Sequence, residues 1–222
     1  MRQWNGLPIF IMGASGTSKE VKGMIEDINA LHQIDTYQII AFVDIEAKED
    51  INGVAVINEE MFYKKLMDFP VAGIVIPFGT PELKMKLYRQ MTECINIVFP
   101  NIIHPCAVVS EMVTMGFGNI VAAGATISPN VNLGNFCLIN NNCNIGHDTK
   151  LADFVVVNPL AAVSGNVTIG QGALIGGSSA ILQGIEIGER ARIGLGAFVV
   201  KDVLSDMTVV CEPAKVRKNE KR

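Results

Sequence analysis

The residues best suited to acid–base chemistry are few. The 222-residue sequence contains three histidines, His32, His104 and His147, and only His147 is followed by an acidic residue, Asp148. A neutral imidazole takes up a proton near pH 7, and an adjacent carboxylate can hold or polarise its ring. His147 and Asp148 therefore predict a general base that could take a proton from an amine or a hydroxyl.

The remaining histidines and the cysteines favour structural roles. His104 lies in Ile103-His104-Pro105, and His32 ends an amphipathic segment as a solvated C-terminal residue. Histidines this dispersed do not supply the neighbouring ligands of a zinc enzyme, so we expect no metal. The five cysteines are odd in number and include no C-x-x-C pair, which argues against a disulfide framework and fits a reducing cytoplasm.

A six-residue repeat positions His147. From Ile103 to Val199, every sixth residue is aliphatic or methionine, and the residue four positions later is mostly small, as at Ala125 and Cys137. The residue directly after the aliphatic position is often Gly or Asn, which predicts corners with positive φ at these positions. Such a period predicts a parallel β-helix in which three repeats make one triangular coil.

Steps of eighteen residues stay on one edge of such a coil. From His147 they lead to Gly165, Gln183 and Lys201. Gly165 keeps the edge beside the base narrow, so that backbone can approach a ligand there. His147 itself falls at a corner, from which its side chain can point outward; a corner histidine that only caps a turn is the alternative.

The first part of the chain has a different pattern. Short apolar runs alternate with amphipathic segments, which predicts strands and helices along a parallel sheet. We therefore expect a small Rossmann-like, nucleotide-binding α/β domain over residues 1–100 and a β-helix with a C-terminal tail over residues 101–222. The expected strands are 8–13, 38–44, 71–77 and 95–99, and the expected helices follow Gly16 and span 59–69 and 81–93.

A glycine turn and an aspartate carry the ligand chemistry of the first domain. Gly13-Ala14-Ser15-Gly16 ends the first apolar run, where backbone N–H groups and a helix N-terminus can cradle a phosphate. Lys19 replaces the third glycine of a dinucleotide fingerprint, so NAD is not expected. Asp44 follows the second expected strand and can accept from a ribose or a uracil edge, although a plain turn aspartate is an equal alternative.

Composition excludes two classes of partner. Lys and Arg total 18 and Asp and Glu total 22, which gives a net charge of −4 and a pI near 5.4. A mildly acidic surface argues against general nucleic-acid binding. The opening apolar run, Leu7 to Ala14, is too short to span a membrane, so we expect no membrane insertion.

The hexapeptide run, the glycine turn after the first strand and Gly146-His147-Asp148 together resemble the sialic acid O-acetyltransferase and nucleotide-aminosugar N-acetyltransferase family, from Ile9 to about Lys215. The resemblance implies a left-handed β-helix, a homotrimer, and acetyl-coenzyme A without a metal in the groove between adjacent prisms. It implies transfer of acetyl to the amino group of a nucleotide-linked aminosugar, with His147 as general base and Asp148 beside it.

The resemblance also places ligand contacts. Gly165 corresponds to a residue whose backbone contacts the acetyl-thioester and could form an oxyanion hole, whereas Val156 replaces a second histidine of many relatives. Gly176, Gly177, Ala197 and Lys215 are the further candidate contacts of the coenzyme, the first three also fitting ordinary corners and the last a solvated tail. Candidate acceptor contacts are Gly13, Ser15, Gly16, Asp44, Gly79 and Lys84.

Two alternatives to N-acetylation remain. One is a sugar O-acetyltransferase of the sialic acid type, which would act on a hydroxyl. The other is a non-catalytic hexapeptide protein that binds a nucleotide sugar or serves as a trimeric scaffold.

Overall fold

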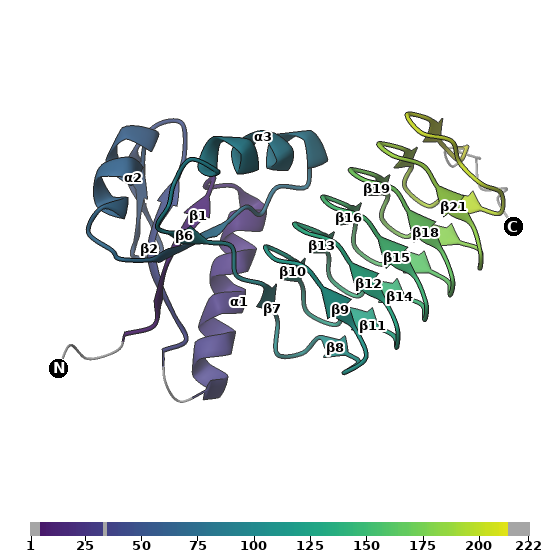
Figure 1. Ribbon diagram of the computed structural model, residues 1–222, viewed down its shortest axis with the longest axis horizontal. Coiled ribbons are helices and arrows are strands. Elements are labelled where there is room, and N and C mark those ends of the chain that lie inside the picture. The colour runs from purple at the N-terminus through teal and green to yellow at the C-terminus, as the bar shows by residue number, and fades with distance from the viewer. Residues whose placement is uncertain (1–4, 33–34, 213–222) are drawn as a thin grey trace, which may run out of the picture.

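The computed structural model describes residues 5–32 and 35–212. Two architectures follow one another along the chain, an α/β unit and a prism of stacked coils (Figure 1). The predicted order, an α/β domain and then a parallel β-helix, is confirmed. None of the helices in the described ranges has the length and apolar character that crossing a membrane requires.

The α/β unit is built on one sheet with the strand order β3-β4-β2-β1-β5-β6. All neighbours are parallel except β3 and β4, which form an antiparallel hairpin. Asn52 and Gly53 close this hairpin with φ angles of 50° and 78°, which an Asn-Gly pair adopts readily. The expected one-directional sheet is therefore wrong at this edge. The strands are β1 (Leu7–Met12), β2 (Tyr37–Val43), β3 (Lys48–Ile51), β4 (Val54–Ile57), β5 (Ala72–Val75) and β6 (Ile97–Val98).

Three helices pack on this sheet, and local sequence sets where they start. The side-chain oxygen of Asn58 accepts a hydrogen bond from the backbone N–H of Met61 at 2.9 Å, which satisfies one unpaired donor of the helix start. Pro81 begins its helix because its missing N–H is not needed there. The helices are α1 (Gly16–His32), α2 (Glu59–Leu66) and α3 (Pro81–Met91).

The prism consists of two-residue strands in three parallel sheets, which we call faces I, II and III. Along the chain, each coil visits face I, then II, then III. Face I contains β7 (Ile102–Ile103), β10 (Ile120–Val121), β13 (Leu138–Ile139), β16 (Val156–Val157), β19 (Leu174–Ile175), β22 (Arg192–Ile193) and β24 (Thr208–Val209). Face II contains β8 (Val108–Val109), β11 (Thr126–Ile127), β14 (Asn144–Ile145), β17 (Ala162–Val163), β20 (Ala180–Ile181) and β23 (Phe198–Val199). Face III contains β9 (Thr114–Met115), β12 (Asn132–Leu133), β15 (Lys150–Leu151), β18 (Thr168–Ile169) and β21 (Glu186–Ile187).

The second residue of each strand from β7 to β23 is the repeated aliphatic residue of the sequence, and it points into the prism. Ile145 and Val163, for example, are fully buried and pair across neighbouring coils. The small residues also fill the interior, and Cys137 and Cys143 are buried among them as free thiols. The hexapeptide period is thus the spacing of one continuous core.

Positive φ angles lie two residues after the position where the sequence analysis expected them. Gly146 follows its aliphatic residue without a positive φ, and the left-handed residue of that corner is Asp148, with φ 59°. Gly146 is required for another reason, because a Cβ there would lie 2.5 Å from the backbone nitrogen of Gly165 in the next coil. The glycines after the aliphatic residues therefore serve close coil stacking.

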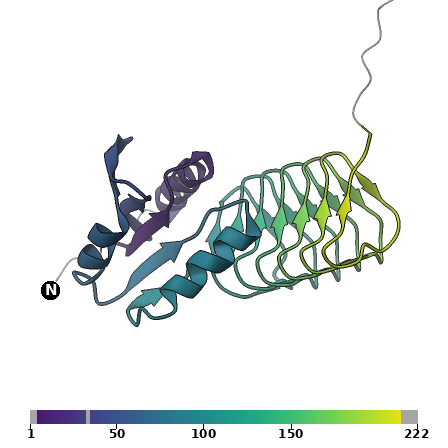
Figure 2. The same ribbon diagram turned by 90° about the horizontal axis from the view of Figure 1, so that it is seen from above.

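The two units share apolar surfaces. Val21 and Ile25 of α1 pack in one cluster with Ile120 and Leu138 on the outer side of face I. On the corner between faces III and I, Tyr88 of α3 contacts a column of phenylalanines, and α3 reaches toward this part of the prism in the view from above (Figure 2). The phenylalanines that Tyr88 contacts are Phe99, Phe117, Phe136 and Phe154.

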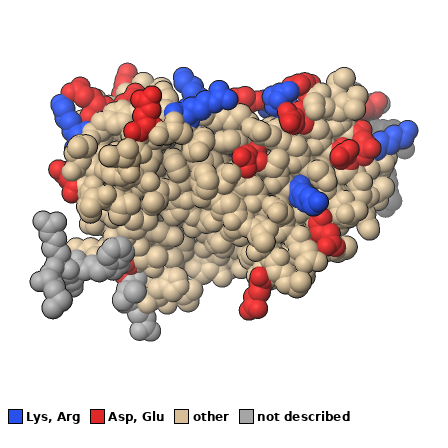
Figure 3. Space-filling view, in the orientation of Figure 1, with Lys and Arg blue, Asp and Glu red and all other residues tan. Residues whose placement is uncertain are grey.

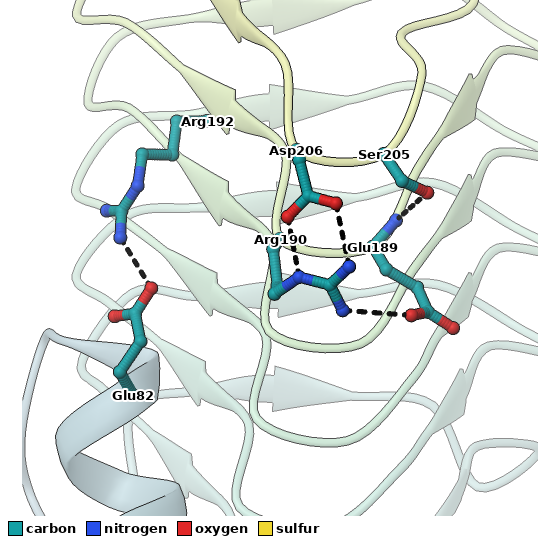
Figure 4. Close-up of polar contacts among 6 residues, drawn as sticks. All are labelled: Glu82, Glu189, Arg190, Arg192, Ser205 and Asp206. Atoms are coloured by element: carbon teal, nitrogen blue, oxygen red, sulfur yellow. Dashed lines mark hydrogen bonds and ion pairs between the residues drawn. The ribbon is translucent and has the colours of Figure 1, made fainter.

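The last coil is shorter than the others and is held by polar contacts. Arg192 of β22 pairs with Thr208 of β24, sixteen residues on instead of eighteen. At the corner before β22, Arg190 makes two hydrogen bonds to the carboxylate of Asp206, at 2.6 and 2.7 Å (Figure 4). Arg192 also reaches Glu82 at the start of α3, at 2.5 Å. Because these ion pairs are exposed, they define geometry more than they add stability.

Lys84 is an exception to the apolar packing beneath α3. Its side chain is 1% exposed, and its ammonium has no hydrogen-bond partner among the described residues. Burial lowers the pKa of Lys84 from 10.5 to about 8, while the nearby thiol of Cys137 acts in the opposite direction to a smaller extent. Burial likewise raises the pKa of Cys137, to about 11, so this thiol stays protonated.

Replacing Lys84 should therefore stabilise the fold. The unfolded chain binds the Lys84 proton more tightly than the folded chain does, so stability rises with pH between about 8 and 10.5, and the penalty is fully present below pH 8. Lys84→Met should raise the free energy of unfolding by about 3 kcal/mol at pH 7 and by much less at pH 10.5, measured by urea denaturation. Lys86→Met, on the exposed side of the same helix, is the matched control and should change stability little. An equal gain at both pH values would contradict the assignment to charge burial.

Candidate functional site

His147 and Asp148 form a hydrogen-bonded pair at the corner between faces II and III. His147 Nδ1 lies 2.7 Å from Asp148 Oδ2, and both side chains are about half exposed. The hydrogen bonds from His147 and then from Asn130 hold the pKa of Asp148 below its ordinary value, so this carboxyl group is ionised and can only accept. Nδ1 must therefore carry the proton, which leaves Nε2 as the basic nitrogen.

Gly165 lies directly under the imidazole, as the step of eighteen residues predicted. A Cβ at Gly165 would come within 2.7 Å of both Cε1 and Nε2 of His147. The next residue is also tied to the base, because the backbone N–H of Asn166 donates to the His147 carbonyl at 2.8 Å. The absence of a side chain at Gly165 thus leaves room for the basic edge of the ring.

The other candidate coenzyme contacts do not lie beside His147 in the same chain. Gly176 is buried against the next coil, where a Cβ would lie only 2.5 Å from the Gly194 carbonyl carbon, and Gly177 lies at the corner between faces I and II. Ala197 is 1% exposed and packs inside the prism, so its expected place in a groove wall is wrong. This position belongs to the small residues that the narrow interior requires. Lys215 lies outside the described residues.

A cavity of about 540 Å³ occupies the carboxyl end of β1 and β2 in the α/β unit. Gly13, Ser15 and Asp44 line it, so the structure brings these three candidate acceptor contacts together. Gly13 has φ 80° and faces the ring of Phe78, to which a Cβ would come within 2.7 Å. Gly16, directly after the turn, begins α1, whose free N–H groups favour an anion.

Two other candidate acceptor contacts do not line this cavity. Gly79 follows Phe78 at the surface, and Lys84 turns away toward the prism, because α3 directs Leu83 and Leu87 to the cavity instead. Lys84 is thus corrected from a ligand contact to a buried residue beneath α3.

Sequence reasoning missed several lining residues of this cavity. Glu59 reaches it from the start of α2, and Phe78 reaches it from the segment after β5. Only Phe78 carried a signal, since it precedes the expected strand-end Gly79 by one position. Burial raises the pKa of the Tyr63 phenol, and the negative charge of Glu59 raises it further.

A second cavity, of about 210 Å³, lies between α1 and the first coils. Thr17 and Glu20 line it from α1, and Asn140 and Asn141 line it from the prism. His104 lies on the same wall. Its Nδ1 accepts from the backbone N–H of Cys106 at 2.9 Å, and its Nε2 lies 3.0 Å from an Asp27 oxygen. His104 thereby connects the prism to α1. Within the described ranges, no cluster of three or more His, Cys, Asp or Glu residues is arranged to hold a metal ion.

A glycine turn at a sheet end and a histidine on the corner of a hexapeptide prism are the two chemical features that this chain combines. Residues 8–91 match the PglD N-terminal domain. No curated protein matches the sequence.

Solved structures extend the likeness over the whole chain. A histidine-to-asparagine variant of perosamine N-acetyltransferase from Caulobacter crescentus, in complex with CoA and GDP-perosamine, is 26% identical, with a TM-score of 0.83 over 96% of this chain and 97% of that one. The acetyltransferase domain of PglB from Neisseria gonorrhoeae, in complex with acetyl coenzyme A, is 28% identical, with a TM-score of 0.81 over 95% and 98%. WeeI from Acinetobacter baumannii is 25% identical, with a TM-score of 0.80 over 94% and 99%.

These matches confirm three expectations from the sequence. The chain has the left-handed β-helix that the resemblance implied. The resemblance to nucleotide-aminosugar N-acetyltransferases holds over nearly the full length. The class of enzyme is an acetyl-coenzyme A-dependent acetyltransferase.

The contact between Gly165 and His147 generates a prediction. Gly165→Ala should displace the imidazole, because the added methyl group would lie 2.7 Å from Nε2. We expect kcat to fall at least tenfold while the thermal unfolding midpoint changes by no more than a few degrees, since the backbone at Gly165 needs no positive φ. Steady-state kinetics and a calorimetric melt measure the two quantities. An unchanged kcat would show that turnover does not depend on the position that the His147 imidazole adopts above Gly165.

Proposed function

We propose that this enzyme transfers acetyl from acetyl-coenzyme A to the amino group of a nucleotide-linked aminosugar, with His147 as the general base. The observation that carries the proposal is the pairing of a nucleotide-sized cavity, lined by Gly13, Ser15 and Asp44, with the His147–Asp148 pair on the same chain. The relative that was solved with both CoA and GDP-perosamine supports it.

The proposed mechanism uses groups whose geometry is described above. As the amine attacks the thioester carbonyl, Nε2 of His147 takes its proton, and Asp148 stabilises the resulting imidazolium through Nδ1–H at 2.7 Å. Collapse of the tetrahedral intermediate expels the coenzyme thiolate, which the imidazolium can protonate. The backbone N–H of Gly165 makes no hydrogen bond among the described residues, so it is our candidate donor to the oxyanion.

The active site we propose combines two protomers. The α/β unit packs on the outer side of face I, whereas His147 lies on the opposite corner, between faces II and III. An acceptor held by Asp44 and the glycine turn therefore meets the histidine of a neighbouring prism, not that of its own. The partly exposed Gly177, at another corner, is kept as a proposed contact of the coenzyme in this shared groove.

A homotrimer supplies such neighbours, and face II offers an apolar surface for it. Two small outward residues, Ala162 and Ala180, leave this face flat. Large apolar side chains surround them. On the side of the molecule that Figure 3 shows, wide areas carry no Lys, Arg, Asp or Glu. The large exposed apolar residues on or beside face II include Val108, Leu160, Leu182, Leu195, Phe198 and Val200.

The trimer predicts a mass in solution of about 72 kDa, three times the chain mass of 24.0 kDa. Phe198→Asp, which buries a charge in the proposed interface, should shift the mass toward 24.0 kDa in light scattering. Ile95→Asp, at a fully exposed apolar residue of the α/β unit, is the control and should leave the mass unchanged. A monomeric wild type would contradict the trimer.

The activity is tested with two single variants and their mixture. We expect His147→Ala to lower kcat by about 10² to 10⁴ with little change in KM for acetyl-coenzyme A. Asp44→Ala should instead raise KM for the nucleotide aminosugar. Free-thiol release from acetyl-coenzyme A, measured with a panel of nucleotide aminosugars and their hydroxyl analogues, reports both constants.

If neighbours share the site, the two impaired variants complement each other when they are assayed at an acceptor concentration well below the raised KM of Asp44→Ala. Refolding Asp44→Ala with His147→Ala should restore turnover, because some sites then combine an intact Asp44 from one chain with an intact His147 from another. Mixtures that stay as slow as the separate variants would contradict the shared site. Near-normal turnover by His147→Ala alone would contradict its role as base, and transfer only to hydroxyl analogues would identify an O-acetyltransferase.

The domain limits and the cellular location are also proposals. The domain limits of 1–100 and 101–222 agree with the change of architecture between β6 and β7. A cytoplasmic location is supported by the five cysteines, all of which are free.

A further inference from the structure

We propose that Asn130 is a positioning residue for the general base, acting through Asp148. Its amide nitrogen Nδ2 donates a hydrogen bond to Asp148 Oδ1 at 3.0 Å, while Asp148 Oδ2 faces His147 Nδ1 at 2.7 Å. Both carboxylate oxygens thus have a partner, one on each side. The inference rests on the proposed function, in which His147 takes the acceptor's proton.

The fold gives Asn130 a fixed position relative to the pair. Asn130 and Asp148 lie eighteen residues apart on the same corner, and both adopt the left-handed conformation, with φ 61° and 59°. The backbone N–H of Asp148 also donates to the carbonyl of Pro129, at 3.1 Å, which locks the two corners together. Asparagine and aspartate are among the few residues other than glycine that adopt this conformation readily.

Exposure explains why a second partner matters. The Asp148 side chain is 50% exposed, so a single hydrogen bond to His147 leaves the carboxylate free to rotate toward water. The Asn130 amide restrains that rotation and favours the ionised carboxylate. An oriented, charged Asp148 keeps the proton on Nδ1 and presents the lone pair of Nε2 above Gly165, toward the groove. Asn130 therefore acts on the orientation and tautomer of a base that it does not touch.

Two substitutions at Asn130 separate this role from simple packing. Asn130→Gly preserves the left-handed backbone and removes the amide, whereas Asn130→Asp preserves shape and replaces the donor with a second carboxylate next to Asp148. We expect kcat to fall about tenfold in Asn130→Gly and further in Asn130→Asp, with KM for both substrates nearly unchanged. If Asn130 served only to fill its corner, the near-isosteric Asn130→Asp would be the milder change, and that order would overturn the proposal.

A double-mutant cycle with Asp148 tests the route of action. In an Asp148→Ala background, Asn130→Gly should cause no further loss of kcat, because the group through which Asn130 acts is absent. A further tenfold loss in that background would overturn the proposal. Asn142→Gly and Asn142→Asp make the same changes at a left-handed residue, with φ 56°, on the corner between faces I and II, and should retain wild-type kcat.

The outcome is distinguishable from failure of the proposed function. Normal turnover by His147→Ala would remove the base itself, whatever the Asn130 variants do. An inactive His147→Ala together with wild-type kcat in both Asn130 variants would overturn only the role of Asn130.

Discussion

The close stacking of coils is the constraint on which the rest of this structure depends. Neighbouring strands in a sheet lie about 4.8 Å apart, and each coil must therefore repeat the path of the one before it. Position 146 must be glycine because the backbone of the next coil packs directly against it. Asp148 adopts a left-handed conformation because the chain turns a corner of the prism there. The same stacking brings Asn130 and Gly165 from the neighbouring coils to the His147–Asp148 pair, although each lies about one coil away in sequence. The spacing of the coils therefore sets the arrangement of the residues around His147.

The packing of the α/β unit adds a second constraint. Its α1 covers the first coils of face I and its α3 covers the neighbouring corner, so these parts of the surface are closed to another copy. Face II and the corner that bears His147 remain open. A chain of this shape separates the cavity of its α/β unit from the His147–Asp148 pair by the thickness of its own prism.

Much of the fold and part of the candidate site could be predicted from the sequence wherever the regular spacing of the coils decides the structure. The six-residue period predicted every coil through Val199, and the eighteen-residue step placed Gly165 under His147, because a solenoid turns sequence distance directly into spatial proximity. Prediction failed where the residue type fits a ligand contact and a buried structural position equally well. Ala197 has the small size that a ligand groove or a crowded core would equally require, and the core uses it. Lys84 has the charge of a phosphate ligand but lies on the prism-facing side of α3, which helical periodicity alone did not distinguish. The only sequence signal for the β3–β4 hairpin is the dipeptide Asn52-Gly53, which favours a tight turn between two antiparallel strands.

The short last coil has a consequence for how the prism ends. A stack of parallel strands presents unpaired backbone groups at its final edge, which is a template for adding strands from another molecule. Here the pairing distance drops from eighteen residues to sixteen, and the coil is tied by Arg190 and Asp206 on one corner. Face III receives only the single bridge of Val203 to Ile187 in place of a full strand. Among the described residues, the terminal edge is consequently irregular and carries charged side chains. Such an edge disfavours end-to-end growth of the solenoid into a fibre.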